Sequence, residues 1–160
     1  MGQRGEMSDF KNNWDFSEKY MPTIKRILSK YALRFVSIEV ADEQEDMTQA
    51  FDLKVTTKNG RVAVRIRRAS IQYRDFTVRA YNKGYKTEIH KLREGYGDWY
   101  LYAWESEGKI SEYALIDINK ARPLFEKDKD LIPNKDGTKF YAYAFDELVK
   151  CGALVAYERI

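Results

Sequence analysis

Cysteine and histidine are almost absent from this sequence, which contains one of each, Cys151 and His90. A single cysteine excludes an internal disulfide, and one residue of each type is too few for a cysteine- and histidine-based zinc site. Carboxylates are therefore the remaining candidate metal ligands, and they favour Mg²⁺ or Mn²⁺. No serine or lysine motif indicates a covalent intermediate.

Long apolar segments are also absent, since no run approaches the roughly 20 residues needed to cross a bilayer. The first residues contain no apolar signal-peptide core, so we expect a cytoplasmic protein with no membrane partner. Hydrophobic residues make up 44% of the chain and only three residues are proline, which indicates a globular chain rather than a disordered one. We expect a flexible leader over residues 1–13 and a single α/β domain over residues 14–160.

The charge is unevenly distributed along the chain. Residues 53–100 contain 12 basic and 4 acidic side chains, a net charge of +8, whereas residues 1–52 carry −3 and residues 101–160 carry −2. A basic central third attracts phosphate backbones, with an affinity that falls as salt rises. The alternative is a charge-balanced protein in which the acidic thirds fold back over the basic one.

Hydrophobic periodicity predicts a mixed α/β order of elements. Thr87 is a typical N-cap for a short helix that Gly95 ends. The segment 98–105 is apolar on both faces and so is expected to be a central strand. The predicted helices cover about 18–32, 87–94, 118–127 and 146–155, and the predicted strands cover about 34–40, 51–57, 61–68, 75–80, 98–105, 110–117 and 139–145.

The strongest local signal is Asn59-Gly60 between the alternating segments FDLKVTT and RVAVRIRR. Asn-Gly is typical of a two-residue hairpin loop, which would place Asp52 opposite Arg67. A four-residue loop would place Asp52 opposite Arg65 instead, and the faces would be unchanged because side chains alternate with period two. One face is then predicted to carry Asp52, Arg65 and Arg67, and the other to carry Leu53, Val55, Val64 and Ile66.

The order helix, strand, hairpin, strand, helix, strand resembles the core of the PD-(D/E)XK nuclease superfamily. That resemblance implies a restriction-endonuclease-like core, a mixed central sheet flanked by helices. In the family, an acid on one hairpin strand and an acid-x-lysine on the next hold Mg²⁺ and a water against a phosphate. Asp52 matches the first acid, but Arg65 and Arg67 occupy the positions of the second acid and the lysine.

The segments EDMTQAFDL, VAVRIRR, TEIHKL and GDWYLY also resemble an uncharacterised group of phage and mobile-element proteins related to those nucleases. Because arginine cannot ligate a metal, the missing acid and lysine would have to come from elsewhere. The resemblance implies Asp46, Asp52 and Glu88 as metal ligands, with Asp52, Glu88 and Lys91 catalytic. Arg65, Arg67 and Arg79 would bind nucleic acid, provided that their strands are adjacent.

Each of these residues also has a structural interpretation. Asp52 facing an arginine is typical of a cross-strand ion pair on a solvated sheet face. Glu88 and Lys91 have the spacing of a surface pair on a helix, and the acidic segment around Asp46 is typical of a solvated loop. The aromatic residues of 99–104 favour a core over a base-stacking platform.

Two functional hypotheses follow. The first is a nuclease-like protein that acts on nucleic acid, DNA in the first instance, with Mg²⁺- or Mn²⁺-dependent phosphodiester hydrolysis. The second is a non-catalytic module on the same fold, such as a phage or mobile-element inhibitor or adaptor, that binds nucleic acid or a protein partner. An arginine pair where catalysis expects acid and lysine favours the second.

Overall fold

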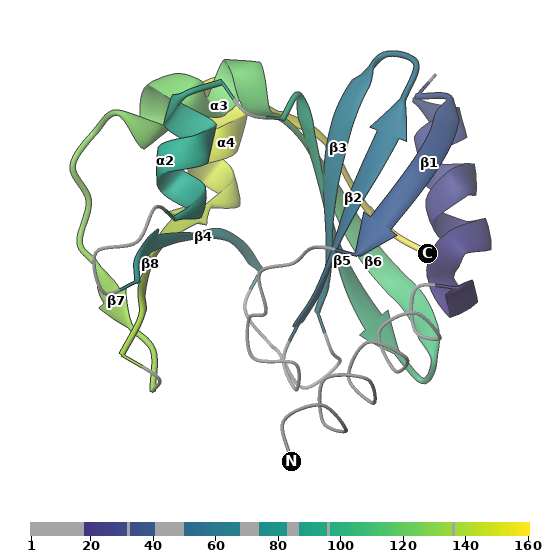
Figure 1. The fold of residues 1–160 in the computed structure, drawn as a ribbon, viewed down its shortest axis with the longest axis horizontal. Coiled ribbons are helices and arrows are strands. Elements are labelled where there is room, and N and C mark those ends of the chain that lie inside the picture. The colour runs from purple at the N-terminus through teal and green to yellow at the C-terminus, as the bar shows by residue number, and fades with distance from the viewer. Residues whose placement is uncertain are drawn as a thin grey trace.

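The computed structural model describes residues 18–31, 33–40, 50–67, 74–82, 87–95, 97–135 and 137–160, and for residues 35, 39, 40 and 50–52 it describes the backbone only. These residues form a mixed α/β structure in three layers: a helix over residues 18–30, a six-stranded sheet, and a layer that combines a small sheet with three short helices (Figure 1). None of the described helices is long and apolar enough to span a membrane.

The large sheet is mixed. Its strand order is β1-β2-β3-β5-β6-β9, in which β3 and β5 are parallel and every other neighbouring pair is antiparallel. Its strands are β1 Phe35–Val40, β2 Ala50–Thr57, β3 Gly60–Arg67, β5 Trp99–Ser106, β6 Lys109–Asp117 and β9 Leu154–Arg159.

The second layer contains the small sheet, in the order β4-β8-β7. Its strands are β4 Asp75–Tyr81, β8 Lys139–Ala144 and β7 Ile132–Pro133, and its helices are α2 Glu88–Arg93, α3 Ile118–Phe125 and α4 Phe145–Lys150. The helices lie on one side of the small sheet, and β4 begins near the large sheet and runs away from it (Figure 1).

Apolar side chains cover both faces of the large sheet. On one face the 18–30 helix contributes Ile24 and Leu28, which are fully buried against β2, β3 and β5. On the other face Tyr102 and Trp104 of β5 pack with Phe76 of β4 and with the three short helices. The prediction that 98–105 forms a central, doubly buried strand is confirmed, because β5 lies between β3 and β6 and residues 100–104 are all buried.

The hairpin turn is displaced by one residue from the favoured prediction. Thr57 pairs with Gly60, so the loop is Lys58-Asn59 and not Asn59-Gly60, and Asp52 lies opposite Arg65, as in the alternative register. Gly60 carries the positive φ, 134°, and a Cβ there would lie 2.6 Å from Asp98 Oδ2. Glycine therefore sets the turn by admitting Asp98, which accepts a hydrogen bond from Arg61 N at 3.0 Å.

The predicted 75–80 strand is confirmed as β4, which pairs with β8 in the small sheet. One prediction about the last elements of the chain is wrong. The last predicted helix ends at Lys150, because Gly152 adopts a φ of 74° and terminates it, and β9 follows at the edge of the large sheet. The 18–32, 87–94 and 118–127 helices are confirmed with small changes at their ends.

A charged cluster fastens the start of β4 to the large sheet. Arg74 donates to Glu112 of β6 through Nε at 2.8 Å and Nη2 at 2.9 Å, and Tyr157 of β9 donates to the same carboxylate. The Arg74 guanidinium also lies 4.7 Å from the ring centre of Trp104. The hydrogen bond from Arg74 is the main reason that the pKa of Glu112 falls from 4.5 to about 2.

We predict that Glu112→Gln lowers the free energy of unfolding by roughly 1–2 kcal/mol at pH 7, since a charge-assisted pair is lost. The pKa of Glu112 is depressed in the folded state, so its contribution is present above about pH 4.5 and disappears as the pH falls through about 2. Urea unfolding at pH 7 and at pH 2 measures this, and the variant should approach wild type at the lower pH. Glu126→Gln, at an exposed position, is the control, and an equal deficit at both pH values would contradict the assignment.

Candidate functional site

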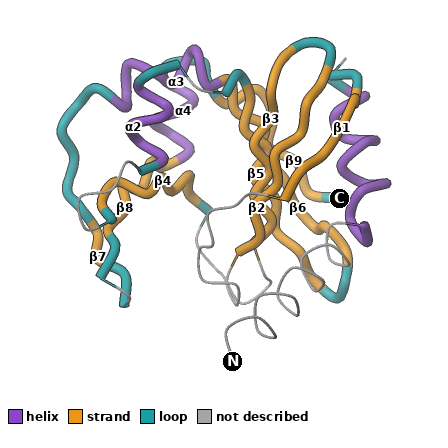
Figure 2. The backbone as a smooth tube through the Cα atoms, in the orientation of Figure 1, coloured by secondary structure: helices purple, strands orange, loops and turns teal. Residues whose placement is uncertain are grey.

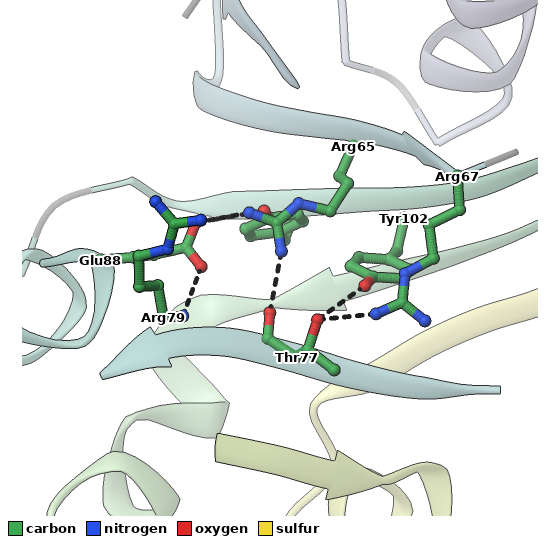
Figure 3. A network of polar contacts seen from close by, with 7 residues as sticks. Arg65, Arg67, Thr77, Arg79, Glu88 and Tyr102 are labelled. Atoms are coloured by element: carbon green, nitrogen blue, oxygen red, sulfur yellow. Dashed lines mark hydrogen bonds and ion pairs between the residues drawn. The ribbon is translucent and has the colours of Figure 1, made fainter. Parts of the chain in front are cut away.

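The candidate site is a set of polar side chains enclosed between β3 and β5 of the large sheet and β4 and α2 of the second layer. We call this set the interlayer network, and Figure 3 shows most of it from close by, with Arg65, Arg67, Thr77, Arg79, Glu88 and Tyr102 labelled. Alternation along β3 sends Val64 and Ile66 to the apolar face and Arg65 and Arg67 to the opposite one. The network consists of Arg65, Arg67, Asp75, Thr77, Arg79, Glu88, Tyr100 and Tyr102.

The hairpin faces are confirmed, but the polar face is not solvated. Arg65 is only 3% exposed, because β4 and α2 cover it. Its Nη1 donates to the Thr77 carbonyl oxygen at 3.1 Å, and its Nη2 lies 3.4 Å from Glu88 Oε2. A buried charge needs such partners, because desolvation without them costs several kcal/mol.

Arg67 occupies the next position on the same face of β3. Its Nη2 donates to Thr77 Oγ1 at 2.7 Å, and its Nη1 lies 3.4 Å from Asp75 Oδ1. The side chain of Arg67 is 11% exposed and that of Asp75 25%, so this end of the network is nearer to solvent than Arg65.

Two tyrosines of β5 form the aromatic part of the network. The guanidinium of Arg65 lies 5.9 Å from the ring centres of both Tyr100 and Tyr102, and that of Arg67 lies 4.8 Å from Tyr102. The hydroxyls of Tyr102 and Thr77 are 2.9 Å apart and hydrogen-bonded. Burial raises the pKa of Tyr102, against the opposing effect of Arg67 and Arg65. The phenol of Tyr102 therefore stays neutral, and its hydroxyl is hydrogen-bonded to that of Thr77 beneath the two arginines.

Glu88 is the first residue of α2, which Thr87 caps as predicted. The Thr87 hydroxyl and the His90 ring nitrogen are 3.0 Å apart, which fixes the helix start. Glu88 then reaches the large sheet, where it accepts from the Tyr100 hydroxyl at 3.2 Å in addition to facing Arg65. It also accepts from the backbone N–H of Arg79 at 3.4 Å. One carboxylate thus joins α2, β3, β4 and β5.

The predicted site residues are only partly brought together. Of the expected acids, Glu88 contacts Arg65, and the backbone register sets the Cα position of Asp52 opposite that of Arg65. Lys91 is half-buried in α2, three residues after Glu88. Asp46 lies outside the described residues. Arg65, Arg67 and Arg79 were expected to act together on the condition that their strands are adjacent. That condition is not met within one sheet, because β4 pairs with β8 in the small sheet.

Of the expected metal ligands Asp46, Asp52 and Glu88, the structure describes the side chain of Glu88 alone. Among the residues that the structure describes, no three acidic, histidine or cysteine side chains gather in one place. The two carboxylates of the interlayer network, Glu88 and Asp75, each face an arginine. A neighbouring guanidinium opposes the approach of a cation, so this arrangement favours anions.

Thr77, Tyr100 and Tyr102 are members of the network that sequence reasoning did not identify. The two tyrosines were expected in the core, and both are buried. Their hydroxyls, however, point into polar contacts with Thr77 and Glu88. The sequence did contain a signal for these contacts. Tyr100 and Tyr102 alternate with Leu101 and Ala103 and so share one face of the strand, and a buried tyrosine hydroxyl usually has a hydrogen-bond partner on that face.

The chain matches no protein-family model, no curated protein sequence and no solved structure. The interlayer network is a cationic layer backed by aromatic rings.

We predict that Arg65→Ala destabilises the protein by roughly 3 kcal/mol, because it leaves Glu88 and the Thr77 carbonyl without a buried cation. Arg61→Ala is the matched control, since Arg61 lies on the same face of β3 but is exposed, and it should cost less than about 0.5 kcal/mol. Urea unfolding measures both. Equal effects of the two substitutions would show that Arg65 is not an essential contact between the layers.

Proposed function

We propose that this protein binds nucleic acid through Arg67 and Arg79, on a PD-(D/E)XK nuclease-like fold. In this proposal Arg65 and Glu88 are positioning residues, which hold the junction of β3, β4 and α2 in place. The main support is the convergence of three arginines from two different sheets on one layer, where the carboxylates that face them are Glu88 and Asp75. Such a concentration of guanidinium groups suits phosphate, which accepts bidentate hydrogen bonds.

Burial divides the arginines between two roles. Arg65 is engaged by Glu88 and Thr77 at 3% exposure, so a phosphate reaches it only if the layers separate. Arg67 is more exposed and lies at the Asp75 end of the network. Arg79 is half-buried on β4, the strand at the edge of the small sheet. Phosphate contact is therefore assigned to Arg67 and Arg79.

The topology of the large sheet supports the nuclease-like core. A helix precedes an antiparallel β1-β2-β3 unit, and the chain then passes through α2 before β5 joins the sheet parallel to β3. With β4 as the strand after the hairpin, this follows the order helix, strand, hairpin, strand, helix and strand on which the resemblance rests. The strand β4, however, belongs to the small sheet and not to the large one.

Metal-dependent phosphodiester hydrolysis is the second candidate function. The observation that favours it is the register of the hairpin, which sets Asp52 opposite Arg65, the arginine that contacts Glu88. A phosphate that separated the layers and paired with Arg65 would release Glu88 from that guanidinium. Cleavage would then be weak or conditional, because in the unliganded protein the arginine neutralises Glu88.

Binding is tested by measuring the affinity for DNA at several salt concentrations. We predict that Arg67→Gln reduces the slope of log affinity against log salt by about one unit, because one phosphate contact is lost. Arg67→Lys keeps the charge and should retain the slope. Arg61→Gln, which removes the exposed arginine of the same strand, is the matched control. Unchanged affinity and slope in Arg67→Gln would exclude this interface, and a wild-type protein that binds no nucleic acid would leave a protein-binding role.

Cleavage is tested separately, on supercoiled and single-stranded DNA in the presence of Mn²⁺. If the wild type cuts, we predict that Asp52→Asn and Glu88→Gln each reduce the rate by at least about 100-fold, since hydrolysis through carboxylate ligands needs both. Asp75→Asn is the control, because Asp75 is the other carboxylate of the network. Undiminished cleavage in both variants would refute the carboxylate assignment, and a wild type that never cuts would leave binding as the function.

A further inference from the structure

The two faces of the small sheet differ sharply. Helices α2, α3 and α4 pack on the face that carries Phe76, Val78 and Tyr143, all of which are at most 1% exposed. Figure 2 shows these helices on one side of β4, β8 and β7. The alternating residues belong to the other face, which we call the open face, although the large sheet covers it at Thr77, which is 9% exposed. They are Thr77 and Arg79 of β4, Phe140 and Ala142 of β8, and Ile132 of β7.

The open face contains a cross-strand row of one cation and two apolar side chains. Arg79 pairs with Phe140, and Phe140 pairs with Ile132 on its other side. Ile132 is 40% exposed, and Phe140 is half-buried. Beside this row Thr77 pairs with Ala142, and the small side chain of Ala142 projects less far from the sheet than the neighbouring Phe140 ring.

The open face continues into the interlayer network. Arg67 donates to Thr77 Oγ1 at 2.7 Å, so its guanidinium borders the β4 edge of the face. Arg79 of β4, which pairs with Phe140, adds a second guanidinium on the same face. Asp75, the acidic side chain of this region of β4, already faces Arg67 at 3.4 Å. The charge bordering the face is therefore positive, which complements a phosphate backbone.

We propose that the open face binds single-stranded nucleic acid, with a base stacked on Phe140 and the adjoining phosphates held by Arg79 and Arg67. This inference rests on the proposed nucleic-acid binding and names the form of the ligand. Aromatic side chains beside a cationic path are the usual elements of single-strand binding, since every base has a face that can stack. Ile132 extends the apolar contact beyond the Phe140 ring.

Geometry favours a single strand over a duplex. Three strands spaced about 4.8 Å apart make a face roughly 10 Å across, wide enough for one row of bases. In a duplex the faces of the bases are stacked on one another and are unavailable to Phe140, except where a base is extruded at a cost of a few kcal/mol. Arg65 lies too deep for a rigid duplex to reach.

The test compares the affinities of fluorescently labelled single-stranded and duplex oligonucleotides of the same sequence, measured by anisotropy at low salt. We expect wild type to bind the single strand at least about tenfold more tightly. Phe140→Leu keeps an apolar side chain for folding but removes the ring, and it should weaken single-strand binding by about five- to 100-fold with little change in the salt slope. Phe140→Trp should retain or strengthen binding.

Tyr81→Leu is the matched control. Tyr81 is an exposed aromatic residue that pairs with Lys139, which places it on the opposite face from Phe140. This substitution should leave the affinity unchanged. Unchanged binding in Phe140→Leu, an equal loss in Tyr81→Leu, or equal affinity for duplex would each overturn the single-strand inference while leaving nucleic-acid binding intact. If neither oligonucleotide binds, the proposed function itself fails.

Discussion

The buried guanidinium of Arg65 is the constraint around which the two sheets are arranged. It projects from β3 on the face opposite Val64 and Ile66. Its partners are in the second layer, where it contacts the Thr77 carbonyl oxygen and the Glu88 carboxylate. A cation at 3% exposure is tolerated only while those partners stay in place. The position of α2, and with it that of Glu88, therefore depends on β3 as well as on the helix itself.

The same constraint shapes the chemistry that is available to the site. Glu88 and Asp75 each face an arginine, and the tyrosine rings of β5 lie beneath the guanidinium groups. This arrangement stabilises negative charge that arrives from outside more readily than a divalent cation. The resemblance to nucleases leads one to expect an acid and a lysine at positions 65 and 67, and the arginines that stand there instead belong to this anion-favouring layer.

Local patterns predicted most of the large sheet. The alternation in β2 and β3 predicted which side chains form the apolar face, although the turn lies one residue earlier because Gly60 must admit Asp98. The β9 strand was missed because the apolar residues after Lys150 fit a helix. Gly152, with its positive φ, was the available sign that the helix stops before them.

The sequence by itself determined the faces of the hairpin, the buried central strand β5 and the start of α2 at Thr87, because each depends on residues a few positions apart. Only the tertiary structure decided that Arg65 is buried, that Glu88 faces it and that Tyr102 meets Thr77. Those contacts join residues that are 12, 23 and 25 positions apart. They exist because β4 belongs to the second layer, which covers the face of the large sheet that carries Arg65 and Arg67. The packing of apolar surfaces on both sheets and the three helices determines this arrangement, and no local pattern does.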